Sequence, residues 1–197
     1  MGSLTDLSAL LKDLWNKLKM ENLELDRTIN SKKVYEGNII NVKIDEVLLK
    51  TGVKAEREVV EHKPAVAIVP VDSENNVLLV RQYRHPAKVD LLEVPAGIIE
   101  PEEEPEVAAL RELQEEVGYT ARDLRLIFGF WTSPGFTDEY IYGFIARDLV
   151  PKPLPQDYDE DISVEKIPIS RLQKLIRLGE IQDSKSIALL MTLSSTM

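Results

Sequence analysis

The amino-acid sequence predicts an α/β fold in which a mixed β-sheet is sandwiched between helices, with a small antiparallel β-sheet domain and a helix ahead of it. Three observations lead to this prediction. Strand-like alternation of apolar and polar residues begins near residue 32 and recurs as far as residue 147. One helical stretch interrupts these strands, and two more follow them. Hydrophobic residues form 44% of the 197 residues, which is enough for a buried core.

The N-terminal region, residues 1–60, is predicted to form a domain of its own. Apolar residues at helical spacing predict an amphipathic helix over residues 4–20, which we expect to pack on the protein or on a second subunit. Membrane binding by this helix is disfavoured because acidic residues dilute its basic ones. Residues 32–60 alternate as strands around turns at Gly37 and residues 50–52, which predicts a small antiparallel sheet.

The second predicted domain, residues 61–197, is expected to contain the mixed sheet and the remaining helices. One helix should begin at Pro105 and end at Gly118, because proline favours the first helical turn and glycine the C-terminal cap. Two further helices should begin at Ser170 and Asp183. The predicted strands cover residues 65–71, 76–83, 91–97, 124–131 and 140–147, and a proline-rich acidic loop is expected over residues 150–161.

The composition excludes several classes of function. A formal net charge of −10 argues against nucleic acid as the main partner, because phosphate binding needs a basic surface. The absence of cysteine excludes disulfides, thiol catalysis and cysteine–zinc sites, and two histidines are too few for a histidine-rich metal site. The sequence shows neither a secretory signal nor an apolar stretch long enough to span a bilayer, so we expect a cytoplasmic protein that does not bind membranes.

Three glutamates on the central helix are the first candidate functional residues. Glu112, Glu115 and Glu116 in RELQEEVG fall at i, i+3 and i+4, so their carboxylates share one helical face. Like charges at this spacing repel each other and weaken a helix. A solvated acidic face is one interpretation. The other is a site for a hard divalent cation, because Mg²⁺ binds oxygen ligands and would remove the repulsion.

Gly97, Glu103, Arg111 and Gly118 flank the three glutamates at regular distances along the chain. This spacing resembles the signature of the Nudix hydrolases, with Tyr119 in place of an aliphatic residue at its last position. The resemblance implies that Glu112, Glu115, Glu116 and the carbonyl of Ala96 hold two or three Mg²⁺ or Mn²⁺ ions. It also implies structural roles for Glu103 and Arg111, which should brace the loop against the helix. Metal contact by Glu103 is an alternative. The matching positions are Gly97, Glu103, Arg111, Glu112, Glu115, Glu116 and Gly118.

Further segments over roughly residues 32–193 resemble the ADP-ribose pyrophosphatase branch of this family. They are RQYRHP, LLEVPAG, and SPGFTDE, which contains Pro134. The resemblance implies Mg²⁺-dependent hydrolysis of ADP-ribose to AMP and ribose 5-phosphate by a homodimer that exchanges its N-terminal sheets. The alternatives are another nucleoside diphosphate sugar or a dinucleotide as the substrate, or a non-catalytic nucleotide sensor.

Within this resemblance, Arg57, Arg84, Glu93 and Pro134 are the candidate substrate contacts. Arg84 could clamp a phosphate, and Arg57 could reach the active site of a neighbouring subunit. Alternatively, Arg57 forms an ordinary ion pair with Glu58, and Glu93 caps or braces its loop. Stacking of the adenine on Tyr35 or Trp15 is a further alternative to packing roles for these rings.

The general base is expected in the acidic loop QDYDEDISV, residues 156–164. The resemblance places the base of the branch in a loop of this kind, and a separate base is needed to deprotonate the attacking water. We favour Glu160, with Asp157, Asp159 and Asp161 as rivals.

Overall fold

The computed structural model of the chain describes residues 26–155 and 161–193. The helix predicted over residues 4–20, with Trp15, lies outside the described residues. So do Asp157, Asp159 and Glu160 of the acidic loop. No helix within the described residues is long and apolar enough to cross a membrane.

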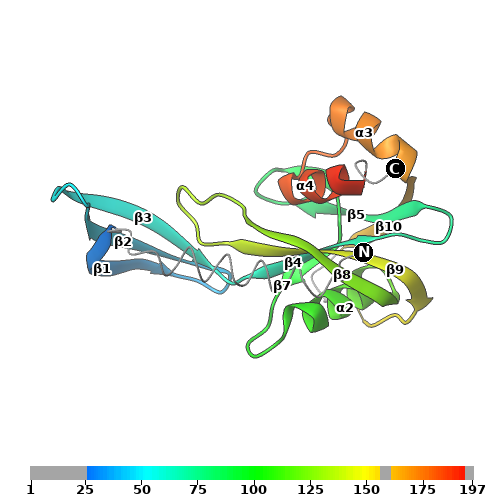
Figure 1. Cartoon of the computed structure of the whole chain (residues 1–197), viewed down its shortest axis with the longest axis horizontal. Helices are drawn as coiled ribbons and strands as arrows, with labels where there is room; N and C mark the ends of the chain where they lie inside the picture. Colours follow the sequence, from blue (N-terminus) through cyan, green and yellow to red (C-terminus); the bar gives the residue numbers. More distant parts are fainter. Residues whose placement is uncertain (1–25, 156–160, 194–197) are drawn as a thin grey trace, which may run out of the picture.

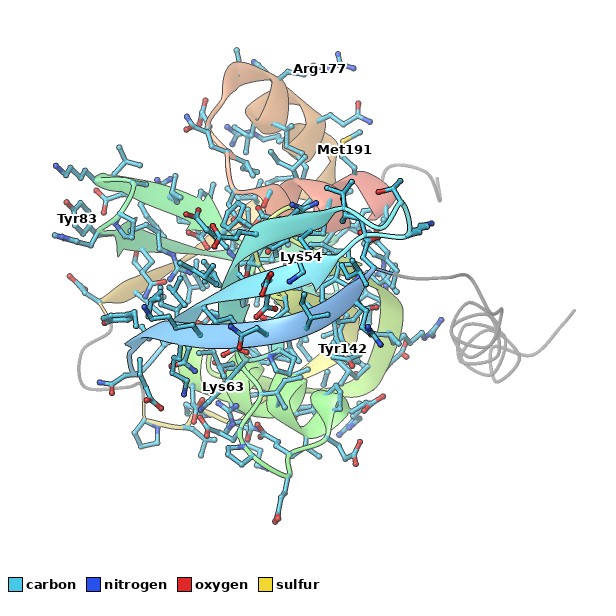
Figure 2. The ribbon with its side chains drawn as sticks, turned by 90° about the vertical axis from the view of Figure 1, so that its left-hand side faces the viewer. Lys54, Lys63, Tyr83, Tyr142, Arg177 and Met191 are labelled. Atoms are coloured by element: carbon cyan, nitrogen blue, oxygen red, sulfur yellow. The ribbon has the colours of Figure 1, made fainter. Side chains whose placement is uncertain are left out.

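The N-terminal sheet consists of β1 (Arg27–Glu36), β2 (Ile40–Leu48) and β3 (Lys54–His62), which pair antiparallel in this order. It projects from the rest of the molecule at the left of Figure 1. Seen from that end in Figure 2, Lys54 of this sheet lies in front of the other strands. Every residue of β1 is exposed, so among the described residues this strand pairs with β2 and buries no side chain.

The other described elements form two further sheets and three helices. They are β4 (Ala65–Pro70), β5 (Asn76–Arg84), β6 (Val89–Glu93), β7 (Ala96–Ile98), α2 (Pro105–Glu116), β8 (Tyr119–Trp131), β9 (Tyr140–Pro151), β10 (Ile162–Pro168), α3 (Ile169–Leu178) and α4 (Ser184–Leu193). The strands β7, β4, β9 and β8 form one mixed sheet, in which β4 and β9 run parallel. The strands β10, β5 and β6 form a second, antiparallel sheet.

The central strand β4 separates two hydrophobic cores. All six of its residues are buried, as expected for a strand covered on both faces. Val66 and Ile68 pack with apolar residues of α2, whereas Ala67 and Val69 pack with residues of α3 and α4. In Figure 1, α2 accordingly lies on one side of the sheets and α3 and α4 on the other. The mixed sheet between helices is therefore confirmed.

The structure differs from the sequence prediction at several strands. β1 begins at Arg27 rather than near residue 32, and β9 continues to Pro151 rather than ending at residue 147. The segment predicted as one strand over residues 91–97 is divided into β6 and β7, because Val94 and Pro95 carry the chain from one sheet to the other. β8 begins at Tyr119 and so follows α2 directly. β10 was not predicted: only one of its residues, Ile167, is buried, so its sequence lacks a clear apolar face.

Candidate active site

Arg111 of α2 is the centre of a hydrogen-bond network on the acidic face. Its Nε and Nη2 donate to the two carboxylate oxygens of Glu103, at 3.0 and 2.9 Å. Its Nη1 donates to Glu112 at 2.6 Å and to Glu115 at 2.9 Å. Nη2 also donates to the carbonyl of Ile98 at 3.0 Å. Arg111 therefore contacts Glu103, Glu112 and Glu115, and it joins α2 to the preceding loop and to β7.

The electrostatics of this network favour the charged state of each partner. Hydrogen bonding to Glu103 raises the pKa of Arg111, and the negative charge of Glu112 adds to the effect against the opposing cost of burial. The same hydrogen bond from Arg111 lowers the pKa of Glu103. The backbone N–H of Glu100 also donates to the carboxylate of Glu103, at 3.0 Å, and lowers the pKa of Glu103 further. Glu103 is thus held as a carboxylate that fixes the loop before α2.

The strand β7 and α2 approach each other closely at Gly97. A Cβ atom at Gly97 would lie 2.0 Å from Oε1 of Glu112, so only glycine leaves room for this carboxylate. The neighbouring backbone N–H of Ala96 donates to Glu116 at 3.1 Å. Glu112 and Glu116 are both buried to more than 90%, and Glu115 completes the same face of the helix. The structure therefore brings the three glutamates together with the backbone of residues 96–97.

Arg84, which is partly exposed, and Glu93, which is buried, form an ion pair on the adjacent strands β5 and β6. The Nε and Nη2 atoms of Arg84 donate to the two carboxylate oxygens of Glu93 at 2.8 and 2.9 Å. Burial works to raise the pKa of Glu93, but the hydrogen bond from Arg84 and the positive charge of Lys185 outweigh it and hold that pKa below its usual range. The pKa of Arg84 is raised mainly by Glu93, with a contribution from the charge of Glu116. Glu93 is followed closely by Ala96, whose N–H donates to Glu116, so the carboxylate of the Arg84–Glu93 pair lies on the strand that leads to the acidic face.

The pKa of Glu93 leads to a prediction about acid stability. Because its folded-state pKa is depressed, the carboxylate stabilises the fold fully above the unfolded-state pKa of about 4.3. The stabilisation is lost as the pH falls through the folded-state pKa. We expect the difference in unfolding free energy between wild type and Glu93→Gln to be constant from pH 6 to 8. Below pH 4.3 it should shrink by up to about 1.4 kcal/mol per pH unit. Urea denaturation across this range measures the difference, and a pH-independent value would contradict the prediction.

The other predicted site residues lie apart from the acidic face in a single chain. Arg57 is exposed on β3 and donates to the carbonyl of Glu56 at 2.9 Å; within the described residues it forms no ion pair with Glu58. Tyr35 is also exposed, on β1. Pro134 is exposed in the loop between β8 and β9. That loop is tied to β3, because the N–H of Val60 donates to the carbonyl of Phe136 at 2.7 Å.

Comparison with known proteins decides the family. The family model described as a NUDIX domain matches residues 61–190, which is well over half of the chain. The chain belongs to the Nudix hydrolases. It is therefore an enzyme that hydrolyses pyrophosphate bonds, and the resemblance read from its sequence is confirmed.

Relatives of this Nudix hydrolase carry several names. An ADP-ribose pyrophosphatase of Bacillus subtilis is 38% identical, over 85% of this chain and 91% of the relative. A methanol dehydrogenase activator of Bacillus methanolicus is 37% identical, over 85% and 92%. A GDP-mannose pyrophosphatase of Salmonella paratyphi B is 36% identical, over 70% and 77%. The crystal structure of an ADP compounds hydrolase matches with a TM-score of 0.81 over 89% of this chain and 95% of that chain; at 24% identity it shows the fold.

Nudix hydrolases generally use divalent metal ions, and the acidic face of this chain fits such a group. Its donors are carboxylates and backbone carbonyls, which are the ligands that Mg²⁺ and Mn²⁺ prefer. Because Gly97 has no side chain, the carboxylate of Glu112 lies directly against the backbone at this residue. Within residues 26–155 and 161–193, no three acidic or histidine side chains yet form a group that could hold an ion. Arg111 instead donates to both Glu112 and Glu115, and its single positive charge offsets part of their repulsion.

The close approach at Gly97 gives a second prediction. In Gly97→Ala the added methyl group should displace the carboxylate of Glu112, which is the mobile end of a side chain. The loss of stability should therefore be small, about 1 kcal/mol or less. Turnover should fall about 10- to 100-fold, because misplacing a functional group by about 1 Å has effects of that size. Gly135→Ala, where a Cβ meets nothing within 4 Å, is the matched control. Equal turnover in both variants would contradict a functional position for Glu112.

Sequence reasoning missed one residue that contacts the predicted site. Lys185 of α4 forms an ion pair with Glu93 and lies 3.0 Å from Asp183. Asp183 was visible in the sequence as a helix start. Nothing in the local pattern indicated that the first turn of this helix would meet a strand 92 residues earlier.

Proposed function

We propose that this Nudix hydrolase cleaves the pyrophosphate bond of ADP-ribose to give AMP and ribose 5-phosphate, in a reaction that depends on Mg²⁺ or Mn²⁺. The observation that carries this proposal is that Arg84 pairs with Glu93 only a short way along the chain from Ala96, whose N–H donates to Glu116 on the acidic face of α2. The guanidinium group of Arg84, which can bind phosphate, would thus act together with the glutamates of the acidic face, which can bind metal. The pyrophosphatase relatives support the choice of reaction, and the ADP-ribose pyrophosphatases among them support the substrate.

The roles of the residues follow from this arrangement. Glu112, Glu115, Glu116 and the carbonyl of Ala96 would hold two or three metal ions. When bound, these ions offset the charge of the pyrophosphate and lower the pKa of a coordinated water. Arg84 would bind a phosphate oxygen through its guanidinium group. Gly97 and Gly118, together with Glu103 and Arg111, would support the loop and both ends of the helix.

The general base is proposed to come from the acidic loop, with Glu160 favoured and Asp161 the rival among the described residues. The register of the second sheet supports this location. Ile162 of β10 pairs with Gln82 of β5, so the described end of the loop, at Asp161, lies next to the part of β5 that leads to Arg84. A base in this loop would therefore approach the same phosphate that Arg84 binds.

A cytoplasmic homodimer is also proposed, with residues 1–60 as the exchanged domain and residues 61–197 as the catalytic domain. The complete exposure of β1, with apolar Ile29 and Val34, leaves a sheet face for a second copy to cover. In such a dimer, Arg57 and Tyr35 of the projecting sheet would approach the other subunit's site. Light scattering of the full chain should give about twice its mass of 22.3 kDa.

The proposed function is tested by product analysis. Purified chain is incubated with ADP-ribose, GDP-mannose and a dinucleotide, each with Mg²⁺ and with EDTA. We expect AMP and ribose 5-phosphate from ADP-ribose, with the largest kcat/KM of the three substrates, and no product in EDTA. A larger kcat/KM for GDP-mannose would replace ADP-ribose with the substrate that the Salmonella relative is named for. No turnover of any substrate would favour a nucleotide sensor.

A further inference from the structure

The first turn of α4 is fastened to the end of β6 by buried polar contacts. The backbone N–H of Val94 donates to the hydroxyl of Ser186 at 2.8 Å. That hydroxyl donates to Asp183 at 2.6 Å, and the N–H of Ser186 donates to the same carboxylate at 2.9 Å. Ser186 is fully buried. These contacts hold the chain immediately before Pro95 and Ala96, where the N–H of Ala96 meets Glu116.

Lys185 extends this contact to the ion pair of Arg84. Its ammonium group donates to Oε2 of Glu93, the oxygen that also accepts from Nη2 of Arg84, and to Asp183 at 3.0 Å. The side chains of Lys185 and Glu93 are only 12% and 2% exposed. Arg84 of β5 and Lys185 of α4 therefore both donate hydrogen bonds to the buried carboxylate of Glu93.

This arrangement has a geometric consequence for Arg84. An arginine and a carboxylate joined by two parallel hydrogen bonds can still rotate together about their side-chain bonds. A third donor, anchored on α4, fixes the carboxylate of Glu93 and therefore the plane of the guanidinium group that pairs with it. Nε and Nη2 are committed to Glu93, which leaves Nη1 for an oxygen of a substrate. The exposed fraction of the Arg84 side chain, 39%, allows such an approach.

We propose that Lys185 is a positioning residue for substrate binding: it holds Glu93, and through Glu93 it holds Arg84 in the orientation that meets the pyrophosphate. Asp183 supports Lys185 from its own helix, and Ser186 ties that helix to the backbone beside Ala96. The inference rests on the proposed function in one respect, that the substrate carries a pyrophosphate bound by Arg84. It goes beyond that function because it assigns a binding role to the C-terminal helix.

The test compares Lys185→Met and Lys185→Arg with Lys174→Met, a matched control at an exposed lysine on α3. We expect KM for ADP-ribose to rise about 10-fold in Lys185→Met, the lower end of the effect of removing a supporting contact. The kcat should stay within about threefold, because Arg84 binds substrate and transition state alike. Lys185→Arg should restore most of the affinity, and Lys174→Met should match wild type. The Kd for ADP-ribose in EDTA, measured by calorimetry, should rise in parallel with KM.

A double-mutant cycle separates positioning from general support of the fold. In an Arg84→Lys background, Lys185→Met should raise KM by less than about twofold, because the group that Lys185 positions is already altered. An equal rise in both backgrounds would overturn the proposal, as would a lower kcat at unchanged KM and Kd. If Lys185→Met does not fold, Lys185→Gln takes its place with the same criteria.

The failure of this inference can be told from the failure of the proposed function. If wild type cleaves GDP-mannose rather than ADP-ribose, the assigned substrate is wrong, and the same variants are compared on GDP-mannose, since the pyrophosphate is common to both. The positioning role is overturned only when wild type cleaves a substrate and the KM of folded Lys185→Met equals the wild-type value.

Discussion

Replacing Glu115 with glutamine is expected to lower kcat/KM by at least about 100-fold. Glutamine keeps the shape of the side chain but removes the negative charge that a hard cation requires. Loss of a residue that merely supports a metal ligand costs about 10- to 100-fold, so loss of a ligand should reach or exceed the upper value. Glu115 is partly exposed, and the amide oxygen of glutamine can still accept the hydrogen bond from Arg111. The variant should therefore fold as wild type does.

Glu106→Gln provides the control for this experiment. Glu106 is an exposed acid in the first turn of the same helix and lies outside the acidic face. Its loss changes the net charge by the same amount and should leave kcat/KM within about twofold. The Mg²⁺ concentration for half-maximal activity, measured with both variants, should rise for Glu115→Gln alone. Retention of more than a tenth of wild-type activity by Glu115→Gln would exclude Glu115 as an essential ligand.

The sequence predicted those parts of the site that lie close together along the chain. Glu112, Glu115 and Glu116 share a face because a helix places i, i+3 and i+4 together, and α2 has the bounds that Pro105 and Gly118 indicated. The contact of Arg111 with Glu115 follows from the same helical spacing, i and i+4, whereas its contact with Glu103 was implied by the resemblance. That Arg111 would meet both, with Glu112 and the carbonyl of Ile98 as well, depends on the path of the loop and could not be read from spacing.

Contacts between segments that are distant in the sequence could not be predicted from the local sequence pattern. Arg84 and Glu93 lie in strands that pair, but alternation alone does not give the register that joins them. Lys185 reads as an ordinary lysine near the start of a helix, and only the packing of α4 on β4 and on the end of β6 brings it to Glu93. The strand β10 was missed for a related reason: its pairing with β5, rather than an apolar face, holds it in the sheet.

Replacing Arg111 with methionine is expected to lower the free energy of unfolding by about 3 kcal/mol. Methionine retains the aliphatic length but leaves the carboxylates of Glu103, Glu112 and Glu115 without their shared cation. Removing one partner of a buried ion pair costs about 3–5 kcal/mol. We expect the lower end, because the Arg111 side chain is 27% exposed and water can screen part of the repulsion. For a chain of this size, the melting temperature should fall by about 6–12 °C.

Two comparisons show whether the loss comes from the network. Arg122→Met removes an arginine whose pair with Asp148 is 3.7 Å long and 72% exposed on the arginine side, so its cost should be under about 1 kcal/mol. Arg111→Lys keeps the charge but cannot reproduce the fork that holds Glu103, so it should recover only part of the stability. Added Mg²⁺ should raise the melting temperature of Arg111→Met more than that of wild type, because a divalent cation can replace the missing charge between Glu112 and Glu115. Equal free energies of unfolding for Arg111→Met and Arg122→Met would contradict the prediction, because they would show that repulsion among the three glutamates does not destabilise the fold when Arg111 is absent.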